Sequence, residues 1–227
     1  MNPKIIIPAR LDSSRFPEKM ITPIHGVPLI LATARNASRS FGTEHVIVAT
    51  CDMKIKKIVE EEFRVCLTCK THETGTDRVA EACINLKLAE DDFIINLQGD
   101  EPFVESEDVK KVFNPYRQEV STGKCMIKPT NDVNRVKLAV KANGYMQYAS
   151  RCPVPHAANK YQKHIGIFGF HVKNLLKFYE KGRTLLESQE NIEVLRFLEI
   201  EIPVMCYDMK ETIAIDTIED LRKIGSL

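Results

Sequence analysis

The chain has 227 residues, of which 44% are hydrophobic and 28% charged, enough apolar material for one core of ordinary size. Its formal net charge of +1 argues against a nucleic-acid partner or a polybasic membrane anchor, and its apolar runs are too short to span a bilayer. Seven scattered cysteines, an odd number, favour free thiols in a reducing compartment, so we expect a cytoplasmic protein without membrane insertion.

Strands and helices alternate through the first hundred residues. The predicted elements, in chain order, are strand 5–7, helix 28–38 after a His25-Gly26 turn, strand 46–50, helix 54–62, strand 65–67, helix 77–86 and strand 93–97. This order, with almost continuously apolar strands, predicts an α/β fold with a mainly parallel, Rossmann-like sheet covered by helices on both faces. Ligands of such sheets bind beyond the carboxyl ends of the strands, so we expect the site in the loops after Ile7, Thr50 and Leu97.

The pattern changes after about residue 125. Asn143-Gly144 separates the runs 137–141 and 145–149 and predicts a β-hairpin. The remaining predicted elements are strand 165–170, helix 191–199 and strands 203–207 and 211–215. No repeat or long linker divides the chain, so we expect one domain over residues 1–227, with this half as a hairpin-bearing elaboration of the first.

Three cations, Arg10, Arg15 and Lys19, follow the first predicted strand, with Ser13 among them. The chain has neither G-x-x-x-x-G-K-[ST] nor a G-x-G-x-x-G after that strand, so a P-loop and a dinucleotide fingerprint are excluded. Forked and point-charge donors suit a triphosphate that side chains would hold. On spacing alone, solvated surface cations are an equally good interpretation.

Two apolar runs end in an aspartate. Gln98-Gly99-Asp100-Glu101-Pro102 follows one, and Asp216 follows the other. Magnesium sites commonly use one or two carboxylates together with phosphate oxygens, so Asp100 and Asp216 could hold one Mg²⁺. The sequence does not show whether the two meet, and the first stretch alone would be a plain acidic turn.

Several motifs, taken in order, resemble the 3-deoxy-manno-octulosonate (Kdo) cytidylyltransferase family from about residue 4 to residue 222. They are Pro8-Ala9-Arg10-x-x-Ser13-x-Arg15-x-Pro17-x-Lys19, His72-x-Thr74-Gly75-Thr76-Asp77-Arg78, Gln98-Gly99-Asp100-Glu101-Pro102, His164-x-Gly166 and Ile215-Asp216-Thr217-x-Glu219-Asp220-Leu221. The resemblance implies a fold of the nucleotide-diphospho-sugar transferase type. It also implies transfer of CMP from CTP to a 3-deoxy-2-ulosonic acid, first of all Kdo, with release of pyrophosphate.

The resemblance also implies roles for single residues. Catalytic roles fall on Arg10, Lys19, Asp100 and Asp216, and both aspartates are the implied Mg²⁺ ligands. The implied nucleotide-binding residues are Pro8, Ala9, Arg10, Ser13, Arg15, Lys19, Thr76, Arg78 and Asp100. The implied sugar-binding residues are Gln98, Arg151, His164, Glu193 and Asp216. Without the resemblance, Arg78 would be a surface arginine and His164 a structural histidine.

The resemblance implies different roles for the two halves of the chain. Residues 1–125 would bind CTP, and residues 126–227 would bind the sugar and form a homodimer. The product would enter lipopolysaccharide or capsule biosynthesis.

Two departures concern the sugar side, and alternatives stay open. The family's His-x-Gly-x-Tyr pattern ends here in Phe168, and its Leu-Glu-Gln-Leu-Arg helix motif becomes Leu195-Arg196-Phe197-Leu198-Glu199 on an ungapped reading. The acceptor could therefore be 8-amino-Kdo or a nine-carbon sialic-type acid. A related fold could use a sugar 1-phosphate, and a non-catalytic sugar-nucleotide binder or a thiol oxidoreductase built on Cys66 and Cys69 are the remaining alternatives.

Overall fold

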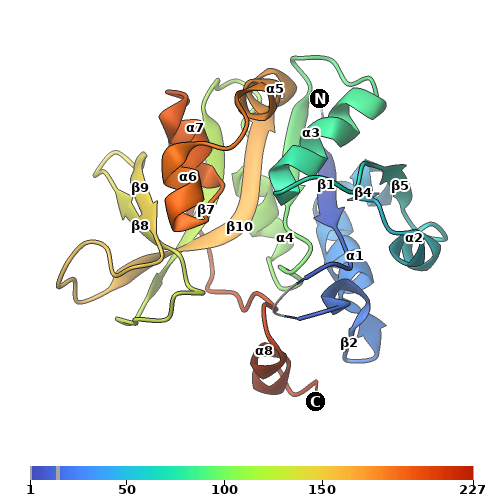
Figure 1. Ribbon diagram of the computed structural model, residues 1–227, viewed down its shortest axis with the longest axis horizontal. Helices are drawn as coiled ribbons and strands as arrows, with labels where there is room; N and C mark the ends of the chain where they lie inside the picture. The colour runs from blue at the N-terminus through green and yellow to red at the C-terminus, as the bar shows by residue number, and fades with distance from the viewer. Residues whose placement is uncertain (1, 14–15, 227) are drawn as a thin grey trace.

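The computed structural model describes residues 2–13 and 16–226. The strands of its main sheet are β1 (Lys4–Ala9), β4 (Val46–Thr50), β5 (Arg64–Leu67), β6 (Phe93–Leu97), β7 (Val120–Ile127), β8 (Lys137–Val140), β9 (Met146–Ser150), β10 (Tyr161–His171) and β11 (Val204–Asp208). The main sheet has the order β11-β7-β10-β6-β1-β4-β5 (Figure 1). Strand β10 is antiparallel to β6 and β7, whereas the other neighbours along this order are parallel. The predicted α/β fold with a mainly parallel sheet is confirmed.

Helices cover both faces of the sheet because alternate residues of its apolar strands point to opposite sides. Ile5 and Ile7 of β1 pack in one apolar cluster with residues of α1 (Leu29–Phe41), α2 (Met53–Val59) and α4 (Ser106–Lys111). Ile6 packs in a second cluster with residues of α3 (Gly75–Asn85), α5 (Val172–Lys181) and α7 (Val194–Glu199). Figure 1 shows α3, α5 and α7 on the same side of the sheet, with α6 (Leu185–Glu190) beside α7.

Both predicted turns are confirmed. His25 and Gly26 have positive φ angles of 47° and 80° and join the short strands β2 (Pro23–Ile24) and β3 (Val27–Pro28). Strands β8 and β9 form the predicted hairpin, and β8 also pairs with β10, which ties the hairpin to the main sheet. Gly144, in the turn between them, has a positive φ angle of 89°.

The sequence does not predict strand β7, although it lies inside the sheet between β10 and β11. Ser121 and Thr122 interrupt its apolar pattern, yet both side chains are buried. Their hydroxyls donate to backbone carbonyls, from Ser121 to Val112 and Gly169 and from Thr122 to Ile167. Hydroxyls that are hydrogen-bonded can be buried at low cost in free energy. This strand can therefore lie inside the sheet without the continuous apolar run that predicts a buried strand.

The predicted strand 211–215 is wrong, and the predicted helix 191–199 begins late. Residues 211–216 form no strand, because they run along the end of the sheet, where Ile215 N donates to Asp100 O at 2.9 Å. Asn191 has a left-handed φ of 55° and ends α6, so α7 starts only at Val194. Helices α4, α5, α6 and α8 (Ile218–Lys223) were not predicted. No helix in residues 2–13 and 16–226 is long and apolar enough to cross a membrane.

Candidate active site

A cavity of about 560 Å³ opens at the carboxyl ends of β1 and β6, the edge at which the sequence predicts ligands. Its lining combines the loops after these two strands, the start of α3 and four residues from the second half of the chain. The lining residues are Pro8, Ala9, Arg10, Asp12, Ser13, Lys19, Met20, Thr74, Gly75, Arg78, Gln98, Gly99, Asp100, Val133, Arg151, Asn191 and Asp216. Most of the predicted site residues therefore share one cavity.

The two predicted metal ligands meet at one lysine. Lys19 Nζ lies 2.7 Å from Asp100 Oδ2 and 3.4 Å from Asp216 Oδ1, and its side chain is 8% exposed. Burial lowers the pKa of Lys19, but the two carboxylates outweigh burial and hold its pKa above the usual value. The lysine therefore stays charged, and carboxylates from distant parts of the chain converge on it.

A buried glutamate brings the segment before Asp216 to this place. Glu101 is 3% exposed; its Oε1 accepts from Gly166 N and its Oε2 from Thr212 Oγ1, both at 3.0 Å. Lys163 Nζ donates to the Thr212 carbonyl at 2.8 Å. Burial raises the pKa of Glu101, and Lys163 partly opposes this. These contacts join β6, β10 and the C-terminal segment.

The loop after β1 is held by a different set of contacts. Leu11 N donates to Asp52 Oδ2 at 2.8 Å, and Arg10 Nη1 donates to the His72 carbonyl at 3.3 Å. Arg10 and Ser13 line the cavity with Pro8 and Ala9. Arg15, predicted to bind the triphosphate, lies outside the described residues.

Arg78 lies at the wall formed by α3. Its Nη1 donates to Thr68 Oγ1 at 2.6 Å and to the Cys69 carbonyl at 3.1 Å. Its Nη2 is buried and has no hydrogen-bond partner among residues 2–13 and 16–226. A donor left over at a cavity wall suits a ligand acceptor such as a pyrimidine carbonyl. Thr76 lies behind this wall, where its hydroxyl accepts from Asn96 Nδ2 at 2.9 Å.

Gln98 and Glu193 meet beside the start of α3. Glu193 Oε1 accepts from Gln98 Nε2 at 2.8 Å, and its Oε2 accepts from Thr76 N at 3.2 Å. Burial raises the pKa of Glu193 to about 7. Glu193 does not line the cavity itself but orients Gln98, which does.

Arg151 lines the cavity and is fixed by three backbone carbonyls. Its Nη1 donates to Val133 O at 2.9 Å, its Nε to Glu190 O at 3.0 Å and its Nη2 to Asn191 O at 2.9 Å. Its position therefore depends on the turn that ends α6. Val133 and Asn191 also line the cavity, and no sequence motif singled them out.

His164 is a predicted sugar ligand that lies apart from the cavity lining. Its Nε2 is 2.8 Å from Thr122 Oγ1, its ring is 5.3 Å from that of Phe168, and it is not part of the cavity lining. Burial lowers the pKa of His164 to about 4, and the Lys163 charge adds to this effect. The ring is therefore neutral at pH 7.

The two departures from the family pattern lie in the core. Phe168 and Phe197 are 1% and 0% exposed, and their rings are 6.5 Å apart. Arg196 is 1% exposed and forms ion pairs away from the cavity, so the ungapped reading of the Leu-Glu-Gln-Leu-Arg motif is wrong. Ile192-Glu193-Val194-Leu195-Arg196 fits that motif instead, with a valine at the glutamine position.

Comparisons with known proteins agree with this arrangement. A family model described as "Cytidylyltransferase" matches residues 4–213. The chain is 37% identical to the 3-deoxy-manno-octulosonate cytidylyltransferase of a Nitratiruptor species, covering 98% of each chain. It is 36% identical to the protein of the same name from Chlorobium phaeobacteroides, covering 90% of this chain and 87% of the relative.

Solved structures give the same result. The structure of CMP:2-keto-3-deoxy-manno-octonic acid synthetase complexed with CTP superposes with a TM-score of 0.87 at 30% identity, covering 99% of this chain and 97% of the other. A putative glucose-1-phosphate thymidylyltransferase from Bacillus anthracis has a TM-score of 0.72 at 14% identity, covering 99% of this chain and 94% of the other, and shows the shared fold alone.

Proposed function

We propose, from the premise that this chain belongs to the 3-deoxy-manno-octulosonate cytidylyltransferase family, that it transfers CMP from CTP to Kdo and releases pyrophosphate. The chain is a nucleotidyltransferase whose relatives of that name match it over nearly their whole length. The structural observation that carries the proposal is the convergence of Lys19, Asp100 and Asp216 at the cavity.

The cations of the cavity would hold the triphosphate. When the anomeric hydroxyl of the sugar acid attacks the α-phosphorus, the bond to the β-phosphate breaks and negative charge builds up on the departing pyrophosphate. Lys19, held by Asp100 and Asp216, and Arg10, which donates to the His72 carbonyl, would stabilise this charge. Arg78 lines the cavity, and its Nη2, which has no partner among residues 2–13 and 16–226, would be the donor for the cytosine.

The donor set near Lys19 fits a magnesium ion. Asp100 and Asp216 offer hard carboxylate oxygens that reach the same ammonium, so they lie close enough to act together. The part of the chain that the structure describes has no cluster of three acidic, histidine or cysteine ligands, and Mg²⁺ commonly completes its shell with phosphate oxygens and water. When bound, the ion would neutralise phosphate charge and acidify the attacking hydroxyl.

The sugar acid would lie between Gln98 and Arg151. Both side chains line the cavity, and an arginine fork suits the substrate carboxylate. Glu193 would act through Gln98, whereas His164 would need an extension of the cavity to reach the sugar. Residues 1–125 would supply most of the nucleotide contacts, and residues 126–227 the sugar side and a homodimer interface. We place the reaction in the cytoplasm, with its product entering lipopolysaccharide or capsule synthesis.

Pyrophosphate release tests this proposal. Purified protein is assayed with CTP and Mg²⁺ against Kdo, 8-amino-Kdo and N-acetylneuraminate in turn, with UTP and ATP as nucleotide controls. We expect turnover with CTP and Kdo, and none when Mg²⁺ is chelated. Turnover with one of the other acids but not with Kdo would identify that acid as the acceptor. CTP binding without pyrophosphate release would favour a non-catalytic binder. Light scattering of the same preparation tests the dimer.

A further inference from the structure

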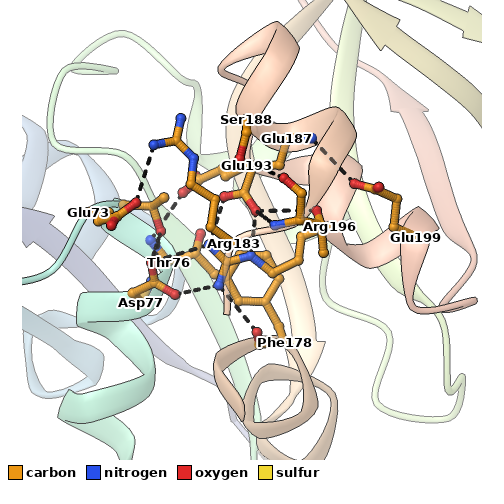
Figure 2. Close-up of polar contacts among 12 residues, drawn as sticks. Glu73, Thr76, Asp77, Phe178, Arg183, Glu187, Ser188, Glu193, Arg196 and Glu199 are labelled. Carbon is orange, nitrogen blue, oxygen red and sulfur yellow. Dashed lines mark hydrogen bonds and ion pairs between the residues drawn. The ribbon is translucent and has the colours of Figure 1, made fainter. Parts of the chain in front are cut away.

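One buried arginine joins three helices behind the cavity. Arg196 Nε and Nη2 donate to the two oxygens of Glu187, both at 2.7 Å. Its Nη1 donates to Asp77 Oδ1 at 2.6 Å and to the Phe178 carbonyl at 3.2 Å (Figure 2). The guanidinium carbon lies 3.7 Å from the centre of the Phe178 ring. Arg196 therefore connects α7 with α3, α5 and α6.

The geometry of this group requires an arginine. Only a planar fork can bind Glu187 bidentately while it reaches Asp77 and lies over the Phe178 ring. The side chains of Arg196 and Glu187 are 1% and 2% exposed, so breaking the pair would leave a buried charge uncompensated. The cluster lies beyond the cavity lining, so Arg196 does not touch a ligand there.

Helices α6 and α7 hold the sugar side of the cavity. Glu187 lies in α6, and the end of this helix supplies the Glu190 and Asn191 carbonyls that fix Arg151. Glu193 directly precedes α7, which carries Arg196, and Glu193 orients Gln98. Each of these contacts would shift if α6 and α7 moved relative to α3.

The nucleotide side has supports of its own. Asp77 keeps its contact with Thr74, whose hydroxyl accepts from Asp77 N at 3.1 Å, so α3 keeps its N-cap without Arg196. Arg78 is held by Thr68 and Cys69, and Lys19 by the two cavity aspartates. None of these contacts runs through α6 or α7, although Thr76 N at the start of α3 donates to Glu193, the residue before α7, at 3.2 Å.

We infer that Arg196 is a positioning residue that sets the sugar side of the cavity and leaves the nucleotide side unchanged. The inference rests on the proposed function, because it assigns the two sides to a sugar acid and to CTP. A shift of about an ångström in a substrate-positioning group can cost up to about a hundredfold in rate.

The test compares Arg196→Lys with the wild type in the pyrophosphate assay. Lysine keeps the charge but loses the fork. We expect the KM for Kdo to rise about tenfold or more, and the KM for CTP to change less than about twofold. Calorimetric titration with CTP alone should give an unchanged Kd. Arg35→Lys is the matched control, because Arg35 also pairs bidentately with a glutamate, Glu62, but on an exposed surface.

Each outcome of this test either supports or overturns the inference about Arg196. An equal rise of both KM values, or no rise in either, overturns the inference, since a purely structural role would affect both substrates alike. If Arg196→Lys does not fold, Asp77→Asn weakens the same junction from α3 and takes its place, with the same split expected. A wild-type protein that turns over none of the acids overturns the proposed function and this inference together. Normal wild-type turnover with an unaffected variant overturns the inference alone.

Discussion

The two sides of the cavity are built in different ways. The nucleotide side comes from the loops after β1 and β6, where side chains a few residues apart leave neighbouring parallel strands. The sugar side comes from Arg151 and from Gln98, the first residue after β6, and both are oriented by the end of α6 and the residues between α6 and α7. One side follows from strand order, whereas the other depends on contacts between residues far apart in the chain.

Asp216 is the exception that shows why this difference matters. It belongs to the last part of the chain, yet it reaches Lys19, because Ile215 and Thr212 are bonded to Asp100 and Glu101 in the turn after β6. A short run of backbone and buried carboxylate contacts is enough to place a charge there. The sugar side, with its helices, needs the ion-paired junction at Arg196.

The largest effect should come from removing either carboxylate. We expect Asp100→Ala and Asp216→Ala each to lower Mg²⁺-dependent turnover about a thousandfold, equivalent to about 4 kcal/mol, with the fold retained. Steady-state pyrophosphate release over a range of Mg²⁺ concentrations measures this. Asp208→Ala, at an aspartate whose side chain is 81% exposed, is the control and should retain full activity. Near-normal rates for either cavity variant at saturating Mg²⁺ would contradict the two-aspartate site.

A smaller effect should appear in the pH dependence of stability. The folded-state pKa of Glu193, about 7, lies above its usual 4.5, so the native state holds an extra proton between these values and the unfolding free energy falls as pH rises. The folded-state pKa of His164, about 4, lies below its usual 6.5, so the unfolding free energy rises with pH in that window. The two slopes oppose each other where the two windows overlap, between pH 4.5 and 6.5.

Removing Glu193 or His164 should leave only the pH dependence that the other residue contributes to the unfolding free energy. We expect the unfolding free energy of Glu193→Gln to rise by about 2–3 kcal/mol from about pH 4.5 to about 6.5, and that of His164→Gln to fall over the same range. Urea unfolding at several pH values measures both. Parallel curves for the wild type and the two variants would show that neither group titrates as its burial implies.

The smallest effect concerns the close contact between β1 and β6. A Cβ at Gly99 would lie 2.9 Å from the Pro8 carbonyl oxygen and 3.0 Å from the Met20 sulfur. We expect Gly99→Ala to lower the free energy of unfolding by about 1–2 kcal/mol and to raise the KM for CTP, because the loop after β1 must move. The KM for Kdo should stay the same, and an increase there instead would show that the two sides are not independent.

The sequence predicts the first half of the fold well. Its strands are almost wholly apolar and alternate with amphipathic helices, so local pattern is sufficient there, and the regular pairing of β1 with β4 and β6 follows. Strand β7 and the segment 211–216 depart from the predictions. Strand β7 carries buried hydroxyls bonded to carbonyls, which interrupt its apolar pattern, and the segment 211–216 is held outside the sheet by bonds to Asp100 and Glu101.

The candidate site divides in the same way. The sequence by itself determined the α/β class, the ligand-binding edge of the sheet and the charged residues after β1 and β6, because these depend on periodicity and on neighbours along the chain. Only the tertiary structure decided that Asp216 reaches Lys19, that Glu193 orients Gln98 and that Arg196 lies in the core. Each of these depends on a contact between residues far apart in the chain, which no local pattern encodes.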